Sequence, residues 1–232
     1  GSGISAESGI PTFRGKEGHW KKFRAEELAT PQAFSRNPAM VWEWYDWRRS
    51  IIASKKPNPG HQILAEWHNI FPEFTLITQN IDGLHQKAGS HDVIELHGNI
   101  WKLRCVNEGI ITENHASHLL NLPPRCSQCG ALLRPHVVWF GESLDMSLLQ
   151  KAIAKASESD VMLVTGTSAV VYPAAAIPAS AAEAGAQLAE INPEQTPLSE
   201  YADWSFRGKA GEILQEINHY LKKASSRNKD SL

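Results

Sequence analysis

The first fourteen residues, GSGISAESGIPTFR, place a Gly-x-Gly turn, serines, a Gly-Ile-Pro step and an arginine in one short block. Glycine has no Cβ, so its backbone can turn tightly and approach a ligand closely. Exposed N–H groups in such a turn, at the start of a helix, suit a phosphate or pyrophosphate. Ala6 stands where a GxGxxG motif has its third glycine, and Gly-x-Gly alone is more typical of a tight surface turn. The motifs that follow decide between these interpretations.

A second candidate site lies in the aromatic stretch WEWYDWRR, residues 42–49. The stretch has helical character, and Tyr45 and Arg48 are three positions apart, so they share one face of a helix. A tyrosine hydroxyl beside a guanidinium makes a clamp for a carboxylate, which arginine can hold through two parallel N–H bonds. The alternative is an amphipathic helix with core aromatics and an outward arginine, and the stretch alone favours that alternative.

The candidate residues must be positioned by strands and helices that alternate along the chain. This alternation predicts an α/β fold with a doubly wound parallel sheet. Short apolar runs that stop at small polar residues are typical of buried parallel strands whose carboxyl ends carry ligands. Such runs cover residues 74–78, 160–165 and 187–191. Helical stretches are expected at 38–55, 61–70, 147–158, 173–184 and 211–223.

Residues 103–133 interrupt this alternation and hold all three cysteines, so we expect a small inserted module there. Residues 1–102 and 134–223 would then form the main domain, with 224–232 as a polar, disordered tail. A Gly-x-Gly turn normally follows a strand, and the sequence begins at the turn. We therefore expect either a truncated N-terminus or another segment in the place of the first strand.

Length and composition describe an ordinary globular protein. The 232 residues can bury one large core, and hydrophobic and charged residues make up 42% and 21% of the chain. The net charge of −2 gives no reason to expect nucleic acid or an anionic membrane as partner. Three cysteines, an odd number, argue against a secreted disulfide framework. We expect a monomeric cytoplasmic protein that binds neither nucleic acid nor membrane, with an organelle as the alternative compartment.

Five motifs occur in order along the chain: residues 1–14, Thr78-Gln79-Asn80-Ile81-Asp82, Leu96-His97-Gly98, Gly166-Thr167-Ser168 and Asn192-Pro193-Glu194. Together they resemble the sirtuins, the NAD-dependent protein deacylases, over nearly the whole chain. The resemblance implies a Rossmann-like NAD-binding domain, a small zinc-ribbon-type module, and a tunnel for acyl-lysine between them. The implied NAD-binding residues are Gly1, Ser2, Gly3, Ser5, Thr12, Phe13, Arg14, Gln79, Asn80, Ile81, Asp82, Gly166, Thr167, Ser168, Asn192, Pro193, Glu194 and Ala210.

The resemblance also makes His97 the catalytic histidine. The chemistry it would serve begins when the acyl oxygen of the substrate lysine attacks C1′ of the nicotinamide ribose and nicotinamide leaves. A base must then activate a ribose hydroxyl, and imidazole, with an ordinary pKa near 6.5, suits this proton transfer. The chain has ten histidines, and the place of His97 between its motif neighbours favours a catalytic role over a structural one.

The substrate-binding residues implied by the resemblance fall in three places. The segment Val138, Trp139, Phe140, Gly141 and Glu142 resembles the one that pairs with an extended substrate peptide by strand addition. Hydropathy alone favours an ordinary core strand there. The Tyr-x-x-Arg pair resembles class III sirtuins, which remove succinyl, malonyl and glutaryl groups, and Ala29 resembles the small residue that leaves room for such chains.

Sirtuins usually carry two Cys-x-x-Cys pairs that bind a structural zinc ion. Cys126 and Cys129 form one such pair, but Cys105 is followed three positions later by Glu108. Structural zinc is almost always four-coordinate and accepts a carboxylate or imidazole. Glu108 is the positional substitute, with His115 and His118 as alternatives. A further alternative is a redox pair of Cys126 and Cys129.

The sequence therefore predicts an NAD-dependent lysine deacylase that prefers acidic acyl groups on protein or peptide substrates and removes acetyl groups more weakly. Its products would be nicotinamide, free lysine and 2′-O-acyl-ADP-ribose. Three alternatives remain: a general sirtuin deacetylase, a mono-ADP-ribosyltransferase on the same scaffold, and an inactive module that binds NAD or acyl-lysine.

Overall fold

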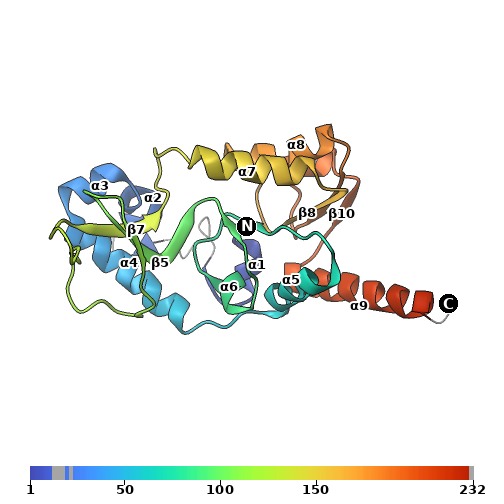
Figure 1. The fold of residues 1–232 in the computed structure, drawn as a ribbon, viewed down its shortest axis with the longest axis horizontal. Coiled ribbons are helices and arrows are strands. Elements are labelled where there is room, and N and C mark those ends of the chain that lie inside the picture. The colour runs from blue at the N-terminus through green and yellow to red at the C-terminus, as the bar shows by residue number, and fades with distance from the viewer. Residues whose placement is uncertain (12–18, 21–22, 230–232) are drawn as a thin grey trace.

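The computed structural model describes residues 1–11, 19–20 and 23–229. Figure 1 shows two groups of elements, with the cysteine-bearing β module and α2–α4 on one side and a helix-covered sheet on the other. The sheet has the strand order β10–β9–β8, and both of its pairings are parallel. Its strands are β8 (Val161–Thr165), β9 (Gln187–Ile191) and β10 (Trp204–Phe206).

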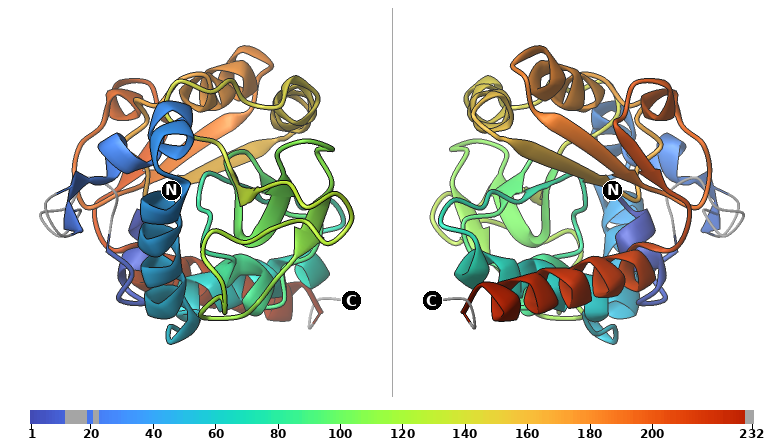
Figure 2. Two further views of the ribbon diagram at one scale, coloured as in Figure 1. Left: turned by 90° about the vertical axis from the view of Figure 1, so that its left-hand side faces the viewer. Right: turned by 90° about the vertical axis from the view of Figure 1, so that its right-hand side faces the viewer.

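Helices cover both faces of this sheet (Figures 1 and 2). One face is covered by α7 (Met146–Ser157), the short turn η1 (Ala174–Ala176) and α8 (Ile177–Glu183), and the other by α5 (Pro59–Ile70) and α9 (Ala210–Lys229). Alternate residues of β9 enter the two cores: Leu188 packs with the α7–α8 side, and Ile191 packs with Leu214 of α9. The predicted doubly wound α/β fold is confirmed, because a parallel sheet buried on both faces needs this alternation.

Two short parallel strands, β3 (Ile77–Thr78) and β4 (Ile94–Glu95), lie near the glycine turn that leads into α1 (Gly3–Ala6). The helix α6 (Leu84–Lys87) connects them. The predicted strand over 74–78 is paired as a strand only at its last two residues. Among the described residues, no strand other than β9 pairs with β8, so none of them takes the place expected for a first strand.

The smaller group contains the antiparallel sheet β6–β5–β7 and a cluster of helices. Its strands are β5 (Gly98–Cys105), β6 (Ile111–Glu113) and β7 (Leu133–Val137), and its helices are α2 (Ala25–Leu28), α3 (Pro31–Arg36) and α4 (Pro38–Ala53). The pair β1 (His19–Trp20) and β2 (Phe23–Arg24) precedes α2, and η2 (Pro197–Glu200) lies before β10.

The helix α4 is held firmly by an arginine that sequence patterns do not single out. Asn37 caps its first turn by accepting a hydrogen bond from the N–H of Met40. Arg49 is fully buried and donates hydrogen bonds to the carbonyls of Ile100 (3.1 Å) and Ala116 (2.7 Å). These bonds satisfy a buried charge and tie α4 to β5 and to the segment after β6. Tyr45 and Arg48, on the same helix, are thereby fixed.

The structure differs from expectation at the C-terminal end. The helix α9 continues through Lys229, six residues beyond the expected end at 223. Residues 224–229 contain no glycine or proline, and their alanine, lysine and arginine favour helix. No helix in the described part of the chain is long and apolar enough to span a membrane.

Candidate active site

Two glycine turns meet at the carboxyl edge of the parallel strands. The N–H of Gly3 donates to the carbonyl of Gly166 (2.8 Å), and Gly166 has a φ of +58°. A Cβ on Gly3 would lie 2.7 Å from the Cα of Gly166, closer than any side chain allows. Glycine is therefore needed here for close backbone approach. The same edge of an α/β sheet is where such folds bind ligands.

Polar side chains from both halves of the chain converge on this edge. Gln79, after β3, donates to the hydroxyl of Thr167 (3.4 Å), after β8. Asn192, after β9, donates to the carbonyl of Thr167 (2.6 Å). Three of the predicted NAD-binding motifs thus lie together: β8 and β9 end at one edge of their parallel sheet, and the residue after β3, a strand of the separate β3–β4 pair, reaches the same edge.

Ser5 is the centre of a buried hydrogen-bond cluster. Its hydroxyl donates to the carboxylate of Asp82 (2.7 Å) and accepts from the amide of Asn80 (3.2 Å). The N–H of Leu84 donates to the second oxygen of Asp82 (2.9 Å). His61 Nε2 lies 3.3 Å from the same hydroxyl and donates to it as well, so the one donor and both acceptor positions of the Ser5 hydroxyl are occupied.

His61 is a site residue that the sequence analysis missed. Its Nδ1 accepts from the N–H of Asn58 (3.3 Å), which leaves the proton on Nε2, facing Ser5. Burial lowers the pKa of His61 to about 4, although the charge of Asp82 opposes this, so the ring is neutral near pH 7. Only its place after the Asn58 helix cap marks it in the sequence, and a cap motif does not reveal a partner 56 positions away.

His97 is half-buried and its tautomer is set by the backbone. Its Nδ1 lies 3.1 Å from the carbonyl of Gln79, which can only accept, so Nδ1 carries the proton. Nε2 of the neutral ring then keeps its lone pair. Burial lowers the pKa of His97, and the carbonyl of Gln79 opposes this only in part. The arrangement therefore supplies a base near neutral pH.

The remaining predicted NAD-binding residues lie around this edge. Ser2 precedes α1 and accepts the N–H of Ser5 (3.1 Å), and the carbonyl of Ile81 accepts the N–H of Ile100 (2.9 Å). Gly1 accepts from Asn80 (3.0 Å). Ser168, Pro193 and Glu194 are in the turns after β8 and β9, and Ala210 is buried at the start of α9, in one core cluster with Ile4. Thr12, Phe13 and Arg14 lie outside the described residues.

The predicted carboxylate clamp lies on α4. Tyr45 is 2% exposed, and its hydroxyl accepts from the indole N–H of Trp139 (2.8 Å). The Arg48 guanidinium lies 5.4 Å from the ring centre of Trp44. Arg48 is partly buried, and burial lowers the pKa of its guanidinium, while the charges of Tyr45 and Asp82 act against this shift.

The segment 138–142 is a turn, so the core strand favoured by hydropathy ends at Val137. Its backbone links two predicted sites, because Val138 N–H donates to the carbonyl of His97 (3.0 Å) and Phe140 N–H to that of Ala29 (2.9 Å). Gly141 has a φ of +84°, which favours glycine.

A partly buried ion pair closes this turn. Arg134 donates to both oxygens of Glu142 (2.6 and 2.8 Å), and its guanidinium lies 3.5 Å from the ring centre of Trp139. Glu142 also accepts the N–H of Trp139 (2.9 Å). Hydropathy cannot detect this pair, and the sequence analysis did not name Arg134.

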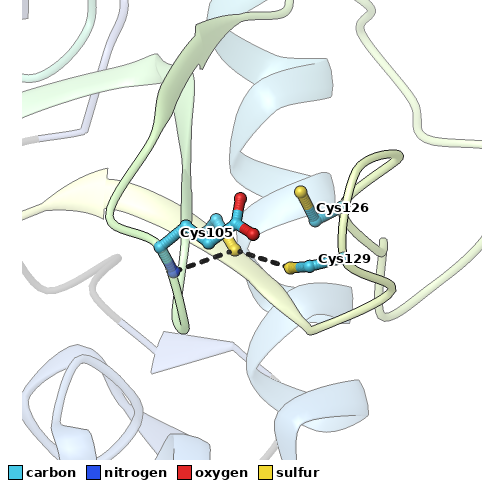
Figure 3. A group of neighbouring side chains, drawn as sticks. Cys105, Cys126 and Cys129 are labelled. Carbon is cyan, nitrogen blue, oxygen red and sulfur yellow. Dashed lines mark hydrogen bonds between the residues drawn. The ribbon is translucent and has the colours of Figure 1, made fainter.

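The three cysteines and Glu108 come together in the β module. Their ligand atoms all lie within 4.8 Å of one another, and the sulfurs of Cys105 and Cys129 are 3.5 Å apart. Figure 3 shows the three thiols turned toward a common point, with Cys105 from β5 and the other two from the loop before β7. His118 instead contacts Asp46 (2.7 Å), and His115 contacts Glu113 (3.3 Å). Three sulfurs and one carboxylate fit a tetrahedral zinc ion.

Parallel strands that end in glycine turns and convergent polar side chains define a nucleotide-binding α/β protein. The chain belongs to the Sir2 family, whose model matches residues 1–173. It is 58% identical over 222 residues to the NAD-dependent protein deacylase of Aquifex aeolicus, spanning 96% of this chain and 93% of that protein. The family expected from the five motifs is confirmed.

Solved structures agree with this assignment. A crystal structure of a Sir2 homolog–NAD complex is similar with a TM-score of 0.91 and 48% identity, covering 96% of this chain and 87% of that one. A mutant Sir2 homologue in complex with 2′-O-acetyl ADP ribose has the same TM-score and identity, covering 97% of this chain and 90% of that one.

Proposed function

We propose that this chain, an NAD-dependent protein deacylase of the Sir2 family, removes acidic acyl groups such as succinyl, malonyl and glutaryl from lysine, and removes acetyl groups more weakly. The observation that carries the proposal is the pairing of Tyr45 and Arg48 on α4, with Tyr45 hydrogen-bonded to Trp139 of the 138–142 turn. That turn also contacts Ala29 and His97 through its backbone. The 138–142 turn therefore connects the clamp, Ala29 and the base.

The residues present fit NAD, because close-packed glycine turns and the Ser5 cluster lie together at the carboxyl edge of the sheet. NAD supplies an electrophilic ribose carbon whose leaving group is nicotinamide. Gln79, Asn80 and Asp82 would surround the nicotinamide ribose, while Thr167 and Asn192 would lie on the adenosine side. Thr12, Phe13 and Arg14 are proposed to complete the site.

His97 would accept the proton of a ribose hydroxyl at Nε2. The carbonyl of Gln79 holds the opposite nitrogen in its protonated form at 3.1 Å, so the ring cannot present the wrong tautomer. The lowered pKa keeps the ring neutral at pH 7. A positioned base of this kind contributes about 10²- to 10⁴-fold to the rate.

The acyl preference would come from the charge of Arg48. A partly buried guanidinium gains from a carboxylate partner more than one in water does, because the partner offsets its desolvation. Hydrogen bonds to charged groups contribute about 1.5–3 kcal/mol, which is roughly 10- to 150-fold in kcat/KM. A neutral acetyl group gains nothing from the clamp, so acetyl removal would be the weaker activity.

We also propose that Cys105, Glu108, Cys126 and Cys129 hold a structural zinc ion. The cluster geometry supports this ligand set over one that includes His115 or His118, which have other partners. The ion would stabilise the β module that ends in the 138–142 turn, and would take no part in the chemistry at His97.

The acyl preference is tested with one lysine peptide in succinyl, glutaryl and acetyl forms, with and without NAD. The proteins compared are the wild type, Arg48→Met, Arg48→Lys and Tyr45→Phe, with Lys155→Met on the exposed face of α7 as a control. We expect Arg48→Met to lose at least about tenfold in kcat/KM for the acidic peptides and little for the acetyl peptide. Arg48→Lys should be intermediate, because a lysine keeps the charge without the bidentate geometry.

Equal losses on all peptides, or faster acetyl than succinyl removal by the wild type, would contradict the proposed preference. Labelled NAD tests the transferase alternative separately: covalent label on protein would favour ADP-ribosyl transfer, while label only in acyl-ADP-ribose supports deacylation.

A further inference from the structure

Glu190 is a buried carboxylate beside the proposed NAD site that no part of the mechanism above uses. It lies near the end of β9 and is 1% exposed. It accepts hydrogen bonds from the hydroxyls of Thr196, Ser199 (2.5 Å) and Ser205 (3.4 Å). Its partners thus come from the turn after β9, from η2 and from β10.

Arg207 supplies the countercharge. One of its terminal nitrogens donates to Glu190 (2.9 Å) and to the carbonyl of Glu194 (3.0 Å), with the carbonyl of Asn192 at 3.5 Å. The other donates to the hydroxyl of Ser199 (2.8 Å). One guanidinium therefore joins the buried carboxylate to the backbone of residues 192–194. The side chain of Arg207 is 38% exposed and that of Glu190 only 2%, so the carboxylate end of the pair is shielded from solvent.

The backbone that this pair holds is joined to the glycine turn. Asn192 donates from its side chain to the carbonyl of Thr167 (2.6 Å) and from its backbone to Phe206 (3.1 Å). Glu194 N–H donates to the side-chain oxygen of Asn192 (3.2 Å), which closes the turn. Without Glu190 and Arg207, the turn would keep these contacts near its first residue and the bonds of Thr196 with Ser199 and Leu198 at its other end, while residues 193–195 would lose the guanidinium that joins them to β9.

We propose that Glu190 and Arg207 are positioning residues that fix residues 192–196 in the form that receives the adenosine of NAD. The inference rests on the proposed function, which assigns Asn192 to the adenosine side; Glu194 lies two residues further along the same turn. Neither residue has to touch NAD. All four partners of Glu190 are donors, so a carboxylate suits the position and a glutamine would turn N–H groups toward donors.

The charges explain why both members are required. Burial alone would raise the pKa of Glu190, but hydrogen bonds from Ser199 and Thr196 and the charge of Arg207 outweigh it, and the group stays ionised. Removing Arg207 leaves the buried carboxylate of Glu190 without its countercharge. Removing both charges leaves no buried charge that needs a partner. The double variant is therefore expected to be less impaired than the two single effects combined.

The experiment compares Glu190→Gln, Arg207→Met and the double variant with the wild type. The control is Glu158→Gln, which breaks an exposed ion pair on α7. Steady-state assays with an acetyl-lysine peptide give separate KM values for NAD and for peptide. Calorimetry with ADP-ribose measures the adenosine side without any catalysis, and thermal denaturation reports folding.

We expect each single variant to raise the KM for NAD and the Kd for ADP-ribose by at least about tenfold, with kcat and the peptide KM changed by less than about twofold. An unchanged ADP-ribose Kd, or equal losses in every parameter that track a lowered Tm, would overturn the inference. If the wild type binds ADP-ribose tightly but never releases nicotinamide, the proposed function fails, and the variants' Kd values still decide the positioning role.

Discussion

Tyr45→Phe removes the hydroxyl that accepts the indole N–H of Trp139 at 2.8 Å. Both side chains are almost fully buried, at 2% and 3% exposure. An N–H left unpaired in such surroundings costs about 1–3 kcal/mol, while the phenyl ring itself still fills the same space. We therefore expect the free energy of unfolding to fall by about 2 kcal/mol. For a chain of this length, that lowers Tm by roughly 4–8 °C.

A double-mutant cycle separates the hydrogen bond from the packing. Trp139→Phe also loses contact with the guanidinium of Arg134, 3.5 Å from its ring centre, and with Phe34, whose ring centre is 5.2 Å away. The combined variant has no orphaned N–H, so the two effects should fail to add by about 1–2 kcal/mol. Urea denaturation followed by tryptophan fluorescence and circular dichroism measures all four proteins.

Either of two results from this cycle would refute the prediction. If Tyr45→Phe unfolds within about 1 °C of the wild type, or if the two substitutions add within about 0.3 kcal/mol, the hydrogen bond does not join α4 to the 138–142 turn. The connection proposed between the clamp and the peptide-binding turn would then have no physical basis.

Three further predictions concern the base, its titration and the metal. His97→Ala should lower kcat by about 10²- to 10⁴-fold and leave the ADP-ribose Kd unchanged by calorimetry, because the side chain acts at the reacting hydroxyl; a weakened Kd would assign it to binding instead. The acid limb of kcat/KM should lie below the ordinary histidine pKa of about 6.5, because burial lowers the pKa of His97 and only the neutral ring is a base; a limb above that value would show that the protonated form is stabilised. Glu108→Ala should weaken zinc retention against a chelator by at least about tenfold, and Glu108→Cys should strengthen it, measured as zinc per chain; equal retention in all three proteins would exclude Glu108 as a ligand.

The convergence of the site motifs could be predicted from the sequence, because it follows from a single rule of architecture. Thr167 and Asn192 follow neighbouring strands of one parallel sheet and so lie at one edge, and Gln79 follows β3, a parallel strand of a separate pair whose end reaches the same edge. Patterns of apolar runs were sufficient to find those strands. The cysteine cluster was likewise indicated by residue type and spacing, and the structure adds that Glu108 lies with the three thiols.

The contacts that hold the site together could not be predicted in this way. Ser5 meets His61 across 56 positions, and Glu190 meets Arg207 across 17, with no periodicity that marks either pair. The turn at 138–142 was hidden because its ion pair with Arg134 lies within an otherwise apolar stretch. Polar partners distant in sequence become visible only when the backbone is in place.

The most direct test of the central claim is a competition in one vessel. Equal amounts of succinyl and acetyl forms of one lysine peptide are incubated with NAD and the wild type or Arg48→Met, and 2′-O-succinyl- and 2′-O-acetyl-ADP-ribose are quantified by mass spectrometry. The account predicts that the succinyl product dominates with the wild type. With Arg48→Met, the ratio of succinyl to acetyl product should fall at least about tenfold, to a value at which the acetyl product dominates. A ratio that favours acetyl with the wild type, or is the same in both proteins, would contradict the account.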